Sequence, residues 1–154
     1  MAKVRAADEK DIPSILELYH QLSLKGKDYK SAPLEDCKKV FALMSQFPDY
    51  SLLVAEEGGE VVGTTMLAIL PSFAHETSPF AVIEYVVVDE KHRRQGIGKL
   101  LMEYAADRAK EAGCYKIMLT SDKRRKPAHR FYESLGFEAS AHGFKLYFKD
   151  GDGL

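Results

Sequence analysis

A turn rich in glycine and basic residues follows an apolar run in this sequence. The run is Val86-Val87-Val88, and the turn is Arg93-Arg94-Gln95-Gly96-Ile97-Gly98-Lys99. From Ile97 onward apolar residues recur at helical spacing, so the pattern predicts a strand, a turn and a helix in succession. The first turn of a helix carries unpaired N–H groups and partial positive charge, and glycines let a phosphate approach them. The stretch therefore predicts a site for a phosphorylated ligand.

Two better-known phosphate loops do not fit this turn. A Walker loop needs Ser or Thr after Gly-Lys, and Leu100 stands there instead. A dinucleotide-binding loop needs a third glycine at the position that Leu101 occupies. What remains is the pattern Arg93-x-x-Gly96-x-Gly98, for which a plain strand-to-helix turn is the alternative interpretation.

Positive charge gathers around the same turn. The 154 residues have a net charge of −1, but residues 89–130 hold 12 Lys and Arg against 6 Asp and Glu. A local excess of this kind indicates a region that faces an anion. The pI near 6.5 argues against nucleic acid as that anion. A small phosphorylated ligand fits the charge distribution better.

The remaining composition excludes several classes of protein. No run approaches the roughly 18 apolar residues of a membrane span, and the first residues lack the apolar stretch of a signal peptide. Cys37 and Cys114 are too few and too isolated for a disulfide framework or a zinc site. We therefore expect a cytoplasmic protein with two reduced thiols, no bound metal and no membrane partner.

Hydrophobic periodicity predicts a mixed α/β domain in which helices flank a mostly antiparallel central sheet. We expect strands at 4–6, 50–56, 60–70, 81–88, 115–120 and 144–148, and helices at 12–22, 34–47, 97–112 and 128–135. Because the sequence has no linker and no repeat, these elements predict a single domain over residues 1–154.

Three segments resemble the GNAT superfamily of acetyl-CoA-dependent N-acetyltransferases. They are Ile83-Glu84-Tyr85-Val86-Val87-Val88, the turn extended to Leu101, and Ala128-His129-Arg130-Phe131-Tyr132-Glu133-Ser134-Leu135-Gly136-Phe137. The resemblance implies a sheet splayed at its two central parallel strands, with the pantetheine arm of acetyl-CoA lying between them. The cofactor-binding residues that it implies are Val86, Val87, Val88, Arg93, Arg94, Gln95, Gly96, Ile97, Gly98 and Lys99.

The resemblance also implies two catalytic residues. Tyr132 would give its phenolic proton to the departing thiolate of coenzyme A. Glu84 would accept the proton of the attacking amine, directly or through water, or would anchor that amine. Strand alternation places Glu84 on the opposite face from Tyr85. We expect Cys114 to be a small buried hydrophobic residue rather than a nucleophile. We therefore expect direct attack in a ternary complex, without a covalent acetyl-enzyme.

One position departs from the family pattern. Many relatives carry Asn three residues before the Ala of Ala-x-x-Phe-Tyr, and this chain carries Arg125 there, within Lys123-Arg124-Arg125-Lys126. Three interpretations stay open for this basic run. It could contact phosphate groups of the cofactor, it could recognise an anionic group on the substrate, or it could be a solvated loop.

The acceptor of the acetyl group is open at this stage. The resemblance implies that residues 23–33 and 71–79 build its pocket, and parts of the chain resemble glucosamine-phosphate and aminoalkylphosphonate acetyltransferases. We therefore expect a primary amine on a small molecule with an anionic phosphorus group. The alternatives are a protein lysine or N-terminus, or a module that binds acyl-CoA without chemistry. A homodimer that uses the closing strand at 143–149 is a further expectation from the resemblance.

Overall fold

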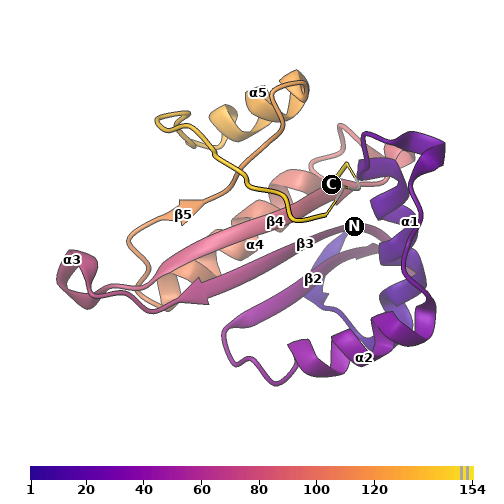
Figure 1. Cartoon of the computed structure of the whole chain (residues 1–154), viewed down its shortest axis with the longest axis horizontal. Helices are drawn as coiled ribbons and strands as arrows, with labels where there is room; N and C mark the ends of the chain where they lie inside the picture. Colours follow the sequence, from indigo (N-terminus) through magenta and orange to yellow (C-terminus); the bar gives the residue numbers. More distant parts are fainter. Residues whose placement is uncertain (150, 152) are drawn as a thin grey trace.

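The computed structural model describes residues 1–149, 151 and 153–154 of the chain. Its sheet has the strand order β1-β2-β3-β4-β5, in which β4 and β5 are parallel and the other neighbours antiparallel (Figure 1). The strands are β1 (Lys3–Ala6), β2 (Tyr50–Glu57), β3 (Glu60–Leu70), β4 (Phe80–Val88) and β5 (Ile117–Met118). The prediction of a mixed, mostly antiparallel sheet is confirmed.

Helices connect and flank these strands. They are α1 (Ile12–Leu22), α2 (Leu34–Met44), α4 (Ile97–Glu111) and α5 (Lys126–Ser134), with short 3₁₀ turns at Glu9–Asp11, Gly26–Asp28 and Glu90–His92. The segment labelled α3 (Ala74–Thr77) is a single turn with left-handed dihedral angles rather than a regular helix. Within the described ranges, every helix is too short or too polar to cross a lipid bilayer. The predicted helices are confirmed with ends displaced by at most a few residues.

Helix α4 covers one face of the sheet. Its Leu101, Ala105 and Ala109 are buried against strand residues that include Leu53 and Ile83. Full burial of a Leu or Ile side chain contributes about 1.5–3 kcal/mol, so this layer fixes α4 firmly beneath the strands. The N-terminus of α4 is thereby held at the end of β4.

Helix α1 lies on the opposite face. The Tyr19 hydroxyl is 3.9 Å from the Met66 sulfur, whereas the next strand residue, Leu67, is buried in the α4 core. Successive residues of a strand point to opposite faces, so α1 and α4 sandwich β3 between them. Helix α1 buries Ile15 and Leu18 on its side.

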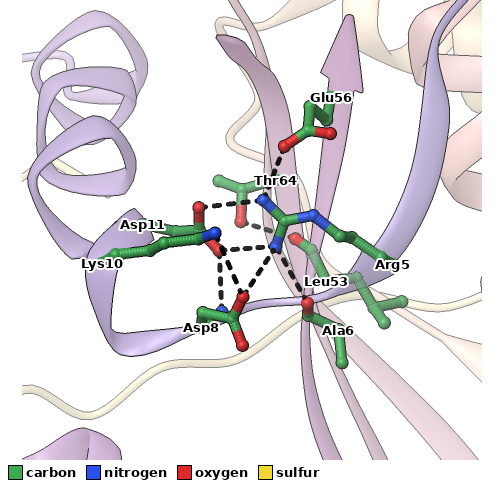
Figure 2. A network of polar contacts seen from close by, with 8 residues as sticks. All are labelled: Arg5, Ala6, Asp8, Lys10, Asp11, Leu53, Glu56 and Thr64. Carbon is green, nitrogen blue, oxygen red and sulfur yellow. Dashed lines mark hydrogen bonds and ion pairs between the residues drawn. The ribbon is translucent and has the colours of Figure 1, made fainter. Parts of the chain in front are cut away.

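An ion-pair network fixes the start of α1 to the sheet (Figure 2). The Arg5 guanidinium donates to both carboxylate oxygens of Asp11, at 2.7 and 3.0 Å, and to Glu56 at 2.9 Å. The Asp8 N–H also donates to Asp11, at 2.7 Å. The network therefore joins β1, β2 and the entry to α1, and it sets the position from which α1 runs across the sheet.

Strands β4 and β5 pair over a very short stretch. The register holds only Ala81 with Ile117 and Val82 with Met118. Beyond these pairs the rest of β4, as far as Val88, runs without a partner on its β5 side among the described residues. The predicted splay between two parallel strands is thus present, and it begins after the second residue pair.

The predicted closing strand at 144–148 is wrong. No strand follows β5 in the part of the chain that the structure describes, so the parallel pair lies at the edge of the sheet rather than at its centre. Phe144 and Phe148 are 93% and 90% exposed, and Leu146 is 80% exposed. The β-forming residues of this segment lack an adjacent strand to pair with, because β5 itself has only two residues.

Candidate active site

A cleft of about 1230 Å³ lies between the free part of β4 and helix α5. Its lining includes twelve of the thirteen residues predicted for the site, namely Glu84, Val86, Val87, Val88, Arg93, Arg94, Gly96, Ile97, Gly98, Lys99, Arg125 and Tyr132. Gln95 lies outside this cleft and lines a smaller hollow beside Met1 and Leu100. The fold thus brings together residues that are up to 48 positions apart.

The end of the cleft that is predicted to bind phosphate is the N-terminus of α4. Gly96 precedes the helix with φ 80° and ψ 6°, a left-handed conformation that favours glycine. The Gly96 carbonyl accepts the Leu100 N–H at 3.0 Å, which starts the helical pattern. Arg94 is also left-handed, with φ 62°. Exposed Arg94 and Lys99 flank this helix end, so the structure provides both N–H donors and positive charge for an anion.

Gly98 has a second role that the sequence did not reveal. A Cβ added there would lie 3.1 Å from Phe131 Cζ and 3.6 Å from Val88 Cγ2. Helix α5 therefore packs directly on the first turn of α4, and glycine is needed for that close approach as well as for ligand access. The contact brings α5, which carries Tyr132, to the same end of the cleft.

A β-bulge at Tyr85 changes the direction of β4 side chains. Tyr85 has φ 56°, and the register with β3 shifts between Thr64 and Met66. Ile83 lies in the α4 core, whereas Tyr85 contacts Tyr19 of α1, with ring centroids 5.5 Å apart. The extra residue breaks the alternation of the strand.

Because of this bulge, the orientation of Glu84 differs from the predicted one. Val86 and Val88 pack on the α4 side together with Ile83, so Glu84 and Tyr85 both fall on the α1 side of the strand. The prediction that they lie on opposite faces is wrong, because strand alternation holds only where no residue is inserted. Glu84 is exposed in the cleft.

Tyr132, the predicted proton donor, lines the cleft. Burial raises the pKa of Tyr132 to about 12, the Arg125 cation acts to lower that pKa, and the Glu84 carboxylate acts to raise it. The phenol therefore keeps its proton at neutral pH. Its ring packs between Phe131 and Phe137, with centroid distances of 5.3 and 5.9 Å. The two predicted catalytic residues, Glu84 and Tyr132, line the same cleft.

Arg125 faces the cleft but contacts main-chain oxygens. Its Nη2 donates to the Leu22 carbonyl at 2.6 Å and to the Gly153 carbonyl at 3.1 Å. Burial lowers the pKa of this guanidinium, although a group with an ordinary value above 12 stays charged at pH 7. Neighbouring Arg124 pairs instead with Asp122, with Nε 2.9 Å from Oδ1. The contact of Arg125 with a cofactor stays a prediction.

Sequence reasoning missed a polar network at the end of β4. Gln21 Nε2 donates to Asp89 Oδ1 at 3.0 Å, and Gln21 Oε1 accepts the Glu90 N–H at 2.9 Å. His92 Nδ1 lies 2.7 Å from Asp89 Oδ2. The hydrogen bond from Gln21 and, to a lesser degree, that with His92 hold the pKa of Asp89 below its usual range. The feature of the sequence that could have indicated this network is Asp89, an acidic residue directly after an apolar strand.

Comparison with known proteins settles the family. The model of the acetyltransferase (GNAT) family matches residues 14–137, which include the whole cleft-forming stretch from β4 to α5. The chain belongs to the GNAT family. GNAT proteins of this kind are acetyl-CoA-dependent acetyltransferases, and this chain is one of them.

Two curated N-acetyltransferases agree with this GNAT assignment, and a solved structure shares the fold. The chain is 30% identical to glucosamine 6-phosphate N-acetyltransferase of Trypanosoma brucei brucei, with 94% of each chain covered. It is 29% identical to aminoalkylphosphonate N-acetyltransferase of Salmonella typhimurium, covering 94% of this chain and 90% of the relative. The crystal structure of a transcriptional regulator from Bacillus halodurans C-125 shares 35% identity, covers 96% of this chain and 100% of that one, and superposes with a TM-score of 0.89.

Proposed function

We propose that this GNAT protein transfers the acetyl group of acetyl-CoA to the primary amine of a small molecule that also carries an anionic phosphorus group. The observation that carries the proposal is the single cleft that joins the basic N-terminus of α4 to Glu84 and Tyr132. The names of the T. brucei and Salmonella relatives support an acceptor with phosphorus. Lys25 and Lys145 also line the cleft and supply charge for such a group.

The α4 end of the cleft is proposed to hold acetyl-CoA by its phosphates. The N–H groups between Arg94 and Lys99, together with the side chains of Arg93, Arg94 and Lys99, would bind the pyrophosphate. The main-chain edge of Val86–Val88 lacks a strand partner on the β5 side in the described residues and would pair with the pantetheine arm. The arm would then take the place of Arg93 Nε, which donates to the Val88 carbonyl at 3.2 Å. Ile97 and Gln95 belong to the same predicted binding turn.

Proton transfer is proposed to involve two side chains. Bound acetyl-CoA supplies the activated thioester. Glu84 would take up the proton that an alkyl ammonium must lose before the amine attacks, since such an amine is almost wholly protonated at pH 7. Tyr132, whose pKa is raised to about 12, would return a proton to the leaving sulfur. The transfer would be direct, within a ternary complex.

Thiol release with matched amines tests this function. Purified protein with acetyl-CoA would be offered glucosamine 6-phosphate, aminomethylphosphonate, unphosphorylated glucosamine and a peptide with a free N-terminus. We expect coenzyme A release with a phosphorus-bearing amine and at least about tenfold lower kcat/KM with glucosamine, from loss of one charge-assisted contact. Equal rates with and without the phosphate would refute the acceptor class, and release with the peptide alone would favour a protein acceptor.

A regulatory role in addition to acetyl transfer is the second candidate, because the similar structure from Bacillus halodurans is that of a transcriptional regulator. A protein with this role would bind acetyl-CoA even where an offered amine releases no thiol. Thermal unfolding with acetyl-CoA detects this binding, and thiol release tests for the transfer. Binding at a hundredfold excess over Kd raises stability by about 2.7 kcal/mol whether or not chemistry follows.

We also propose a homodimer built through the segment 144–148. Phe144, Leu146 and Phe148 alternate along it and are 80–93% exposed, while Lys145 and Tyr147 between them line the cleft. The side of this segment that carries Lys145 and Tyr147 thus faces the cleft. The other side is apolar and exposed, and a second copy of the chain would bury it. Sedimentation should give twice the monomer mass, and Leu146→Glu should give a monomer. A monomeric parent protein would refute the proposal.

Two free thiols, Cys37 and Cys114, support the proposal of a reducing, cytoplasmic location.

A further inference from the structure

The last residues of α1 and the turn that follows them are hydrogen-bonded to both sides of the cleft. We define the roof as residues 21–25, of which Gln21, Leu22, Leu24 and Lys25 line the cleft. On the β4 side, the Gln21 side chain bonds Asp89 and the Glu90 N–H. On the α5 side, the Leu22 carbonyl accepts Arg125 at 2.6 Å. The roof therefore spans the cleft from wall to wall, next to the turn that carries the predicted phosphate site.

Arg125 joins the roof to a third segment. The same Nη2 atom that donates to Leu22 also donates to the Gly153 carbonyl at 3.1 Å, and that carbonyl accepts the Leu24 N–H at 2.9 Å. One cation thus holds two carbonyl oxygens from segments far apart in sequence. The C-terminal segment that contains Gly153 accordingly lies beside the turn after α1 (Figure 1).

Gly153 fits this place for two separate reasons. Its φ of +81° is left-handed, which side chains disfavour. A Cβ added there would also lie 2.7 Å from Ser23 Oγ and 2.9 Å from the main-chain nitrogens of Leu24 and Lys25. These distances are too short for nonbonded atoms, and two of the atoms are backbone. Alanine at this position must therefore lift the segment off the roof.

We propose that Arg125 and Gly153 form a latch that keeps the roof closed over the bound arm of acetyl-CoA. Opening the roof is then a step in both the entry and the departure of the co-substrate. Arg125 is a positioning residue in this view, because it acts on the ligand through the roof. The inference rests on the proposed binding of acetyl-CoA in this cleft, but the latch itself can be tested without any ligand.

The test compares three single variants of the full chain. Gly153→Ala displaces the latch segment by contact, and Arg125→Ala removes the cation that holds it. Gly151→Ala is the matched control, since its added Cβ would meet only the Tyr147 ring, at 3.6 Å, an ordinary contact. The measurements are amide hydrogen exchange of residues 21–25 without ligand, and the dissociation rate of acetyl-CoA by stopped flow.

We expect both latch variants to raise roof exchange and acetyl-CoA dissociation at least about tenfold, which corresponds to about 1.4 kcal/mol. The control should match the wild type in both measurements. The proposal is overturned if roof exchange stays unchanged in the latch variants. It is also overturned if Arg125→Ala alone speeds dissociation, because Arg125 would then be a ligand of the cofactor.

Failure of the proposed function would give a different result from failure of the latch proposal. If the wild-type protein does not bind acetyl-CoA, the cleft has another ligand and the co-substrate half of the proposal falls. The exchange comparison still decides whether the latch exists. Faster exchange in both latch variants would support it, and unchanged exchange would refute it.

Discussion

Substitution of Asp11 by asparagine tests how the entry to α1 is held. The Asp11 side chain is 6% exposed and accepts two hydrogen bonds from Arg5 and one from the Asp8 N–H, at 2.7–3.0 Å (Figure 2). Asp11→Asn keeps the shape of the side chain but removes its charge. It also turns one acceptor oxygen into an NH₂ group that faces the donors of Arg5 or Asp8.

The size of the effect follows from this geometry. Breaking a buried ion pair by removing one partner costs about 3–5 kcal/mol. For a domain of this length, each 1 kcal/mol lowers Tm by about 2–4 °C, so Asp11→Asn should lower Tm by about 6–20 °C at pH 7. Asp8→Asn is the matched control. Asp8 is 63% exposed and 3.8 Å from Arg5, so its loss should cost at most about 1 kcal/mol.

The effect of Asp11→Asn should depend on pH in one direction. Hydrogen bonds from Arg5 hold the pKa of Asp11 below its usual range. A carboxylate with a depressed folded-state pKa contributes stability that is fully present above its unfolded pKa, about 3.9. That contribution is lost as pH falls through the folded pKa. The gap between wild type and Asp11→Asn should therefore be constant from about pH 5 to 8 and shrink below about pH 4.

Urea unfolding of the wild type and both variants across this pH range makes the measurement. Two results would contradict the reasoning. One is a cost below about 1 kcal/mol for Asp11→Asn at pH 7, which would mean that the pair is effectively solvated. The other is a gap that does not shrink at low pH, which would mean that shape rather than charge is responsible.

Three further substitutions test the site and its support. Tyr132→Phe should lower kcat by about 10²–10⁴ and leave the Kd of acetyl-CoA unchanged, and wild-type turnover would remove Tyr132 from the acid role. Gly63→Ala would place a Cβ 3.0 Å from Leu101 Cδ1 and 3.3 Å from the Val87 carbonyl, so urea unfolding should show a loss of about 1–3 kcal/mol. An unchanged midpoint would mean that α4 moves aside freely. Lys99→Ala should weaken acetyl-CoA binding about tenfold at low salt, with a smaller difference at 1 M NaCl. Equal affinities at low salt would exclude Lys99 as a phosphate contact.

Local patterns were enough to predict most elements and the turn into α4 that lines the cleft. The strand Glu60–Leu70 and the helix Ile12–Leu22 have the predicted bounds, because their periodicity and flanking turn residues lie within the segment. The turn that ends at Lys99 was predicted for the same reason. Its glycines, charges and following helix are contiguous, and a helix N-terminus needs no distant partner.

Features that depend on distant partners were not predictable. The contacts of Arg125 reach Leu22 and Gly153, which are 103 and 28 positions away. Residues 144–148 have strand-forming side chains, but a strand also needs a neighbour, and the sequence does not say that β5 ends after two residues. The bulge at Tyr85 was hidden because a tyrosine with positive φ costs energy that only the surrounding packing can offset.

The sequence also did not reveal the left-handed turn at residues 75–77. His75, Glu76 and Thr77 have φ of 49°, 59° and 66°, although left-handed conformation costs roughly 1–2 kcal/mol per residue. The His75 ring stacks on Tyr115 with centroids 3.8 Å apart. That contact joins residues 40 positions apart, and it partly offsets the cost. The sequence predicted only a loop there.

The brief pairing of β4 with β5 divides the chain into two units of unequal local stability. Strands β2, β3 and β4 are held to one another along most of their length. By contrast, β5 and the residues after it are joined to the rest of the fold through two residue pairs, the packing of α5 and the hydrogen bonds of Arg125 and Gly153 to the roof. Sub-global opening should therefore release the segment after α4 while the rest of the sheet stays folded. A ligand that bonds to both walls of the cleft would add contacts between the two units. In native-state hydrogen exchange, acetyl-CoA should thus protect the second unit far more than the first.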